Sequence, residues 1–161
     1  MGGKNIVPMK QLTSLLANNH YQHVQTYIQS GNVVLSSAKR PDNHISTLVQ
    51  SEFGFKPEII VLDQTEFMAA LKNNPFSASE GKCIHFYFCQ SKPKLDREKI
   101  ESLKAASEQY TVKNKVFYLF APDGIGKSKL VAKIEACLGV MATGRNLNTI
   151  NKIQSMLASS T

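Results

Sequence analysis

The apolar residues of this chain alternate between helical spacing and strand-like runs. In the first half, leucine, isoleucine and valine recur three or four positions apart in three stretches, which indicates three amphipathic helices. Between them lie short runs rich in β-forming residues, one of them interrupted by a Ser-Gly-Asn turn. The pattern predicts, in order, a helix from Pro8, a hairpin over 23–35, a helix from Pro41, a short buried strand over 58–62 and a helix from Asp63.

The second half repeats this order with one more strand in front. Its pattern predicts a strand over 83–89, a helix from Asp96, a hairpin over 110–120, a helix over 130–138, a short strand over 140–143 and a closing helix over 147–157. Strand, helix, two strands, helix and strand is the order of a ferredoxin-like unit. The sequence therefore predicts that the two halves have related folds.

The predicted fold class is α+β, with duplicated ferredoxin-like halves of the βαββαβ type, the first half lacking its first strand. We expect the first half to span 1–75 with its trailing helix, a polar joint to span 76–82, and the second half to span 83–161 with the closing helix. A missing first strand would leave neighbouring strand edges unpaired. We therefore expect either an upstream segment, lost through truncation or a mis-assigned start, or another strand in that place.

Composition narrows the class of protein. Hydrophobic residues make up 42% of the 161 residues and charged residues 19%, which excludes a disordered chain. The net charge of +7 favours anionic partners, but nucleic acid only if the charge is concentrated on one face, and the basic residues are spread along the chain. Three cysteines without a CxxC pair predict reduced thiols and a cytoplasmic protein, and no run of residues suggests a signal segment or a membrane span.

Residues 121–128 fit a relaxed phosphate-loop pattern between a strand and a helix. Nucleoside triphosphate chemistry is disfavoured, because Ala121 replaces a glycine, Pro122 removes a backbone donor, and only 33 residues follow Ser128. A milder prediction is that the amides after Gly126 bind an anion, helped by Lys127 and Lys129. The alternative is that the glycines only permit a tight turn while the lysines face solvent.

A second glycine corner contains Arg145 and Asn146. A guanidinium suits bidentate contact with phosphate or carboxylate. The alternative is that Asn146 caps the closing helix while Arg145 binds a neighbouring carbonyl. Lys4 and Asn5 follow a glycine pair and would form a third arm of a binding cleft if the halves face one another.

No catalytic set emerges from the titratable residues. His85 lies in a strand with apolar neighbours and is predicted to be a core histidine with its hydrogen bonds satisfied. His20, His23 and His44 have no cysteine or aspartate at ligand spacing, so a metal is disfavoured. Nothing in the sequence indicates a cofactor.

Four segments resemble the bacterial family called domain of unknown function 1697 (DUF1697). They are Gly2-Gly3-Lys4-Asn5 with Val7-Pro8-Met9, then Thr26-Tyr27-Ile28-Gln29-Ser30-Gly31-Asn32-Val33-Val34, then Pro122-Asp123-Gly124-Ile125-Gly126-Lys127-Ser128-Lys129-Leu130, and finally Ala142-Thr143-Gly144-Arg145-Asn146-Leu147-Asn148-Thr149. The resemblance implies a pair of ferredoxin-like halves and no securely established function. This chain departs from the family pattern by lacking its upstream strand and by having Leu147 where tryptophan is usual.

The prediction for function is binding of a small anionic or phosphorylated ligand, or of a nucleic-acid backbone. An enzyme acting on a phosphorylated metabolite is one alternative, and a structural or oligomeric interaction module without a small-molecule ligand is another. No membrane partner is expected, and a homo-oligomer stays open. The predicted ligand contacts are Lys4, Asn5, Gly126, Lys127, Ser128, Lys129, Arg145 and Asn146.

Overall fold

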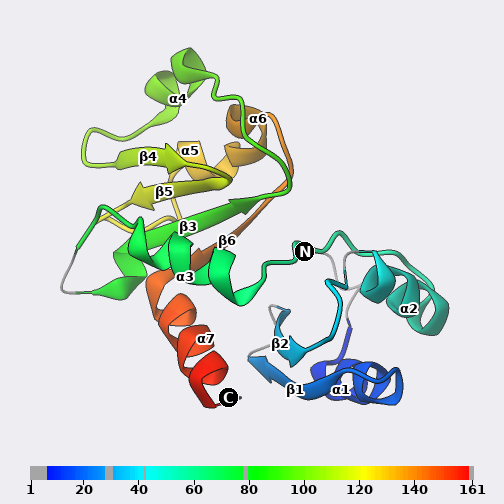
Figure 1. Cartoon of the computed structure of the whole chain (residues 1–161). Coiled ribbons are helices and arrows are strands. Elements are labelled where there is room, and N and C mark those ends of the chain that lie inside the picture. Colours follow the sequence, from blue (N-terminus) through cyan, green and yellow to red (C-terminus); the bar gives the residue numbers. More distant parts are fainter. Residues whose placement is uncertain (1–6, 28–30, 42, 78–79, 160–161) are drawn as a thin grey trace. The chain divides into compact units, whose positions relative to one another are not determined.

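A computed structural model describes residues 7–27, 31–41, 43–77 and 80–159 of the chain. They form a mixed α/β protein in which the described residues build seven α-helices and two antiparallel sheets (Figure 1). The chain divides into two compact units. Unit 1 comprises Met1–Gln64 and Lys152–Thr161, and unit 2 comprises Thr65–Asn151.

Unit 1 contains two complete helices, the end of another and a two-stranded sheet. Its elements are α1 (Met9–Asn18), β1 (Gln22–Tyr27), β2 (Asn32–Ser36), α2 (His44–Phe53) and, from Lys152 on, the end of α7 (Leu147–Ser159). The predicted hairpin is present, since β1 and β2 pair antiparallel with Tyr27 opposite Asn32. The predicted apolar spacing is confirmed as well, because residues one helical turn apart are buried in one core cluster, namely Leu12 and Leu16 on α1 and Ile45 and Val49 on α2.

Unit 2 contains a four-stranded sheet in the order β4-β5-β3-β6. Its elements are α3 (Gln64–Lys72), the 3₁₀ turn η2 (Gly81–Cys83), β3 (Ile84–Cys89), α4 (Arg97–Leu103), β4 (Gln109–Lys113), β5 (Val116–Phe120), α5 (Lys129–Ala132), α6 (Ile134–Leu138), β6 (Ala142–Asn146) and the start of α7 (Leu147–Ser159). Every residue of β3 is buried. The predicted order of strand, helix, two strands, helical segment and strand is therefore observed in this unit.

Helices cover both faces of the unit 2 sheet (Figure 1). On one face, which we call the Tyr87 face, Tyr87 and Leu119 pack with apolar residues of α4, α5 and α6. On the other face the Tyr118 hydroxyl donates a hydrogen bond of 2.6 Å to the Ala70 carbonyl of α3. A buried hydrogen bond of this kind fixes the position of α3 over the strands.

Three predicted elements differ from those observed. Residues 58–62 form no strand, because none of the described strands pairs with them. The predicted helix over 130–138 is divided into α5 and α6 at Lys133, whose φ of −124° and ψ of 29° are not helical. The predicted strand over 140–143 lies further along the chain, as β6.

In the described part of unit 1 there are two strands only, so the duplicated ferredoxin-like architecture stays a prediction. Among the described residues, no helix is long and apolar enough to cross a membrane.

Candidate functional site

Two chain segments with candidate ligand contacts meet at one edge of the unit 2 sheet. β5 and β6 are both antiparallel to β3, so they run in the same direction and end at the edge where β3 begins. There the Ala121 N–H donates to the Cys83 carbonyl over 2.8 Å, and Asn146 lies opposite His85. We call this region the strand-end edge; it consists of residues 81–85, the loop 121–128 and residues 145–148.

The glycine loop leaves the sheet through a left-handed turn. Gly124 has φ +84°, and its N–H donates to the Ala121 carbonyl over 3.0 Å. Ile125 packs against the core beneath, whereas Gly126 and Lys127 are exposed. Lys129 is exposed too and is the first residue of α5, which has only four residues. Such a short helix adds little dipole, so anion binding here would depend on the lysines and on individual N–H groups.

Ser128 and Asn146 each cap a helix through an oxygen atom. Ser128 Oγ accepts a hydrogen bond from the Val131 N–H over 3.2 Å, and Asn146 Oδ1 accepts one from the Thr149 N–H over 3.0 Å. The capping interpretation of Asn146 is therefore observed. Both caps use acceptor atoms only, which leaves the Ser128 hydroxyl hydrogen and the Asn146 amide group as donors.

Arg145 starts from the face opposite to Asn146. It is paired with Phe86, whereas Asn146 is paired with His85, and successive side chains of a strand point to opposite faces. The Arg145 Nη1 donates to the Gly144 carbonyl over 2.8 Å, as the alternative interpretation predicted. Burial lowers the pKa of the guanidinium from its ordinary value. Arg145 and the glycine loop are thus at the same edge but begin on different sides of the sheet.

Lys4 and Asn5 lie outside the described residues. The acidic residues nearest in sequence to the strand-end edge already have partners. Asp123 accepts a hydrogen bond of 2.6 Å from the Ser107 hydroxyl, and Glu80 forms an ion pair of 2.9 Å with Lys82. Their carboxylates therefore compete less with an incoming anion than unpaired carboxylates would.

His85 has a buried nitrogen without a hydrogen-bond partner. The residue is only 6% exposed, and its Nε2 is the one unpartnered side-chain atom found in the buried parts of the described structure. The ring also bonds to the Lys82 backbone, and burial outweighs that bond in lowering the pKa of the imidazole from its ordinary value. The prediction that all hydrogen bonds of this core histidine are satisfied was therefore wrong. The only signal in the sequence was a titratable residue amid the apolar residues of a strand.

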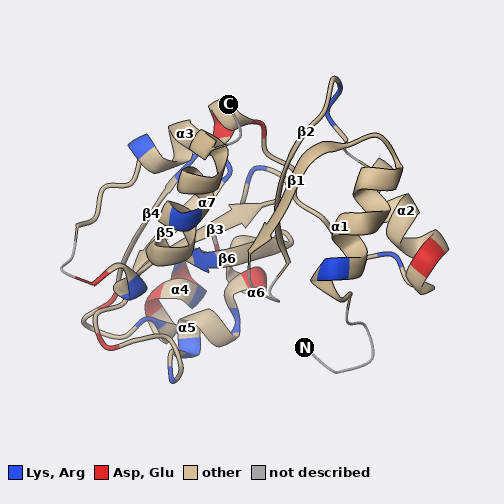
Figure 2. Cartoon of the chain, turned by 90° about the horizontal axis from the view of Figure 1, so that it is seen from below, with Lys and Arg blue, Asp and Glu red and all other residues tan. Residues whose placement is uncertain are grey.

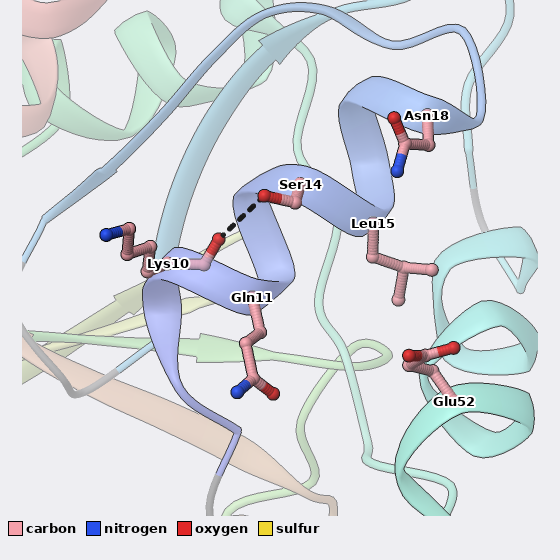
Figure 3. A pocket seen from close by; sticks show the side chains of 6 residues that line it. All are labelled: Lys10, Gln11, Ser14, Leu15, Asn18 and Glu52. Carbon is pink, nitrogen blue, oxygen red and sulfur yellow. Dashed lines mark hydrogen bonds between the residues drawn. The ribbon is translucent and has the colours of Figure 1, made fainter.

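Unit 1 contains a separate shallow pocket of about 370 Å³ between α1 and α2 (Figure 3). It is lined by Lys10, Gln11, Ser14, Leu15 and Asn18 on α1 and by Glu52 on α2. Figure 3 shows the Lys10 side chain pointing away from Glu52, and the Ser14 hydroxyl is bonded to the Lys10 carbonyl. Among the residues that the structure describes, none of the predicted contacts lines this pocket, and its polar groups do not converge.

The positions of the basic side chains and of potential metal ligands bear on which ligand this chain binds. Lys and Arg occur on helices, strands and loops rather than on one element (Figure 2). Within the residues that the structure describes, no group of three His, Cys, Asp or Glu side chains is placed to hold a metal ion.

Comparisons with known proteins connect this chain to a family. It is similar to the structure of a conserved bacterial protein from Streptococcus pneumoniae, with 25% sequence identity, a TM-score of 0.71, and coverage of 98% of this chain and 92% of the other. A search of curated proteins found no significant match. The model of a protein family of unknown function, DUF1697, matches residues 1–118, a range that includes the first two of the four resembling segments but not the last two. The chain belongs to the DUF1697 family.

Proposed function

We propose that unit 2 binds a small phosphorylated ligand at the strand-end edge. The observation that carries the proposal is the parallel course of β5 and β6, which end on either side of the first residues of β3. This topology brings the glycine loop and Asn146 to one edge. The Lys127 ammonium, the Ser128 hydroxyl and the Asn146 amide are the proposed contacts, together with the backbone N–H of Gly126.

The balance of donors and acceptors supports an anionic ligand. Ser128 Oγ and Asn146 Oδ1 are occupied as acceptors by helix N–H groups, so these side chains offer hydrogen atoms to a ligand. Lys127 adds a positive charge at an exposed position. A phosphate group accepts hydrogen bonds from all three kinds of donor.

A small ligand fits the charge distribution better than a nucleic-acid backbone. A nucleic-acid site neutralises several phosphates and requires basic side chains gathered along one surface. The lysines and arginines of this chain are scattered over many elements (Figure 2). Binding of a backbone would appear as a steep loss of affinity between low and physiological salt.

The remaining predicted contacts are proposed in a supporting role. Lys129 adds charge beside the loop, and Arg145 would contact a ligand that extends around the edge of the sheet from the opposite face. Lys4 and Asn5 lie outside the described residues and stay predicted contacts. Alanine substitutions of these residues are expected to weaken binding less than Lys127→Ala does.

Calorimetric titration with inorganic phosphate and n-propyl phosphate tests the proposal. Lys127→Ala should weaken binding roughly tenfold, the loss expected for one charge-assisted contact. The matched control is Lys115→Ala, which removes another exposed lysine from the turn before β5, at the end of that strand far from the glycine loop. Absence of binding in the wild type, or an equal loss in both variants, would contradict a site at the strand-end edge.

Two wider predictions belong with this proposal. We infer that the halves 1–75 and 83–161, linked by 76–82, descend from a duplicated ferredoxin-like unit, supported by the strand order of unit 2. We infer a cytoplasmic location from the thiols of Cys83, Cys89 and Cys137, which are all free. Fractionation of cells that express a tagged chain tests the location.

A further inference from the structure

His85, which carries the unpartnered nitrogen, is paired in the sheet with one of the proposed ligand contacts. His85 is directly opposite Asn146 in the β3–β6 pairing and opposite Leu119 in the β3–β5 pairing. Side chains of directly paired residues lie on the same face, with Cβ atoms about 5 Å apart. The glycine loop begins at Ala121, two residues beyond Leu119, where the Ala121 N–H donates a hydrogen bond to the Cys83 carbonyl. His85 is therefore on the side of the strand-end edge from which Asn146 and the loop project.

The protonation of the ring follows from its one hydrogen bond. Nε2 has no partner, and the hydrogen bond to the Lys82 backbone raises the pKa of the imidazole, so we assign this bond and its hydrogen to Nδ1. Burial disfavours the charged imidazolium. The ring is therefore neutral, and Nε2 presents a lone pair that can only accept a hydrogen bond.

A buried acceptor without a donor is uncommon in folded proteins and calls for an explanation. A fully deprotonated phosphate ester cannot supply a donor, because all its free oxygens are acceptors. A hydroxyl group can. Lys127, Ser128 and Asn146 offer hydrogen-bond donors, which suit a phosphate group. His85 offers an acceptor, which suits a hydroxyl group, so one ligand needs both groups.

We propose that His85 Nε2 accepts a hydrogen bond from a hydroxyl group of the bound ligand, which is therefore a hydroxylated phosphate ester such as a polyol or sugar phosphate. This inference rests on the proposed function, because the phosphate group is held by the contacts argued above. Asn146 fixes the geometry between the two groups, since its Oδ1 is held by the start of the 13-residue helix α7 and its amide faces the same side as His85.

Nε2 is buried, so a ligand hydroxyl reaches it only if the atoms that cover it move on binding. The hydroxyl group would then occupy space beside Leu119 and Asn146.

The test compares glycerol 3-phosphate with n-propyl phosphate, an ester of the same carbon length without hydroxyl groups. Affinity is measured by calorimetry, and the ring nitrogens of His85 are followed by NMR in the wild-type chain. We expect glycerol 3-phosphate to bind roughly two- to tenfold more tightly, the range for one net hydrogen bond. The Nε2 resonance should move with glycerol 3-phosphate and stay in place with n-propyl phosphate.

Two variants separate the effect of the Nε2 acceptor on affinity from the effect of the shape of the ring. His85→Phe fills the space without an acceptor and should bring the affinity ratio of the two esters close to one while n-propyl phosphate still binds. His85→Gln keeps an acceptor and should retain part of the ratio. If His85→Phe fails to fold, the NMR titration of the wild type decides the question alone.

Each outcome bears on a different proposal. Equal affinity for the two esters with an unmoved Nε2 resonance overturns the role of His85 and leaves the phosphate site standing. A resonance that moves identically with both esters also overturns it, since the hydroxyl then plays no part. Failure of both esters and of inorganic phosphate to bind overturns the proposed function, and the role of His85 with it.

Discussion

Replacing Gly144 by alanine would place a methyl group in space that the Tyr87 ring occupies. A Cβ built on Gly144 lies 2.5 Å from Cε1 and 2.9 Å from Cδ1 of that ring. Carbon atoms at optimal separation are about 3.5–4.0 Å apart, so the contact is short by about an ångström. Either the ring or β6 has to move.

The ring has little freedom to move. Tyr87 is 5% exposed and packs edge-on against Phe117 at a centroid distance of 6.1 Å. Burial, with a smaller contribution from Glu108, raises the pKa of Tyr87 to about 12. Overpacking of this kind costs typically about 1–3 kcal/mol, and the loss of backbone entropy in the unfolded state returns about 0.4–1 kcal/mol. We therefore expect Gly144→Ala to lower the free energy of unfolding by about 1–2 kcal/mol.

Urea unfolding followed by circular dichroism measures this change, with Gly126→Ala as the matched control. Gly126 has no atom within 4 Å of a built Cβ and no positive φ, so alanine there should leave stability unchanged or raise it slightly. Equal free energies of unfolding for the two variants would refute the packing of Tyr87 over Gly144 and the pairing of β6 with β3. In a double-mutant cycle, Tyr87→Ala should relieve much of the cost of Gly144→Ala.

Three further changes test the surroundings of the site. Tyr118→Phe should lower the free energy of unfolding by about 1–3 kcal/mol, measured by urea unfolding, because the buried Ala70 carbonyl loses its donor. Ser128→Ala should cost about 0.5–2 kcal/mol in the same assay, through loss of the cap on the Val131 N–H, and Ser128→Asn should cost less. Burial holds the folded pKa of His85 below its ordinary value, so the unfolded chain takes up a proton that the folded chain does not bind as the pH falls below about 6.5. Below that pH the free energy of unfolding should fall by up to about 1.4 kcal/mol per pH unit, and this dependence on His85 should vanish in His85→Phe. Parallel pH profiles of stability for the wild type and His85→Phe would contradict it.

Local patterns in the sequence were sufficient for the elements that local forces determine. The turn at Gly54 ends α2 because its φ of +84° suits glycine, and the apolar spacing before it marks the buried side of the helix. The hairpin of β4 and β5 turns at Asn114, which has φ +55°. In these places the residue type and the backbone conformation agree, so the sequence alone identifies the element.

Elements that depend on distant partners were predicted less well. Residues 58–62 have the composition of a strand, but none of the strands in the described part of the chain pairs with them. β6 extends to Asn146 through arginine and asparagine, which have little intrinsic preference for a strand, because every residue from Ala142 to Asn146 is paired with β3. Strand boundaries of this kind are decided by the neighbouring strand and cannot be read from the segment itself.

The position of β6 also decides which candidate residues can act together. When residues 144–146 are taken as a loop, Arg145 and Asn146 are free to reach one ligand alongside Lys127. Within a strand their side chains alternate, so Asn146 shares a face with His85 while Arg145 starts from the other face and binds the Gly144 carbonyl. The proposed site therefore depends on Lys127, Asn146 and His85 more than on Arg145. Because residues 142–146 form a strand and not a loop, Arg145 is no longer one of the main proposed contacts. His85, which the sequence analysis assigned to the core, takes its place.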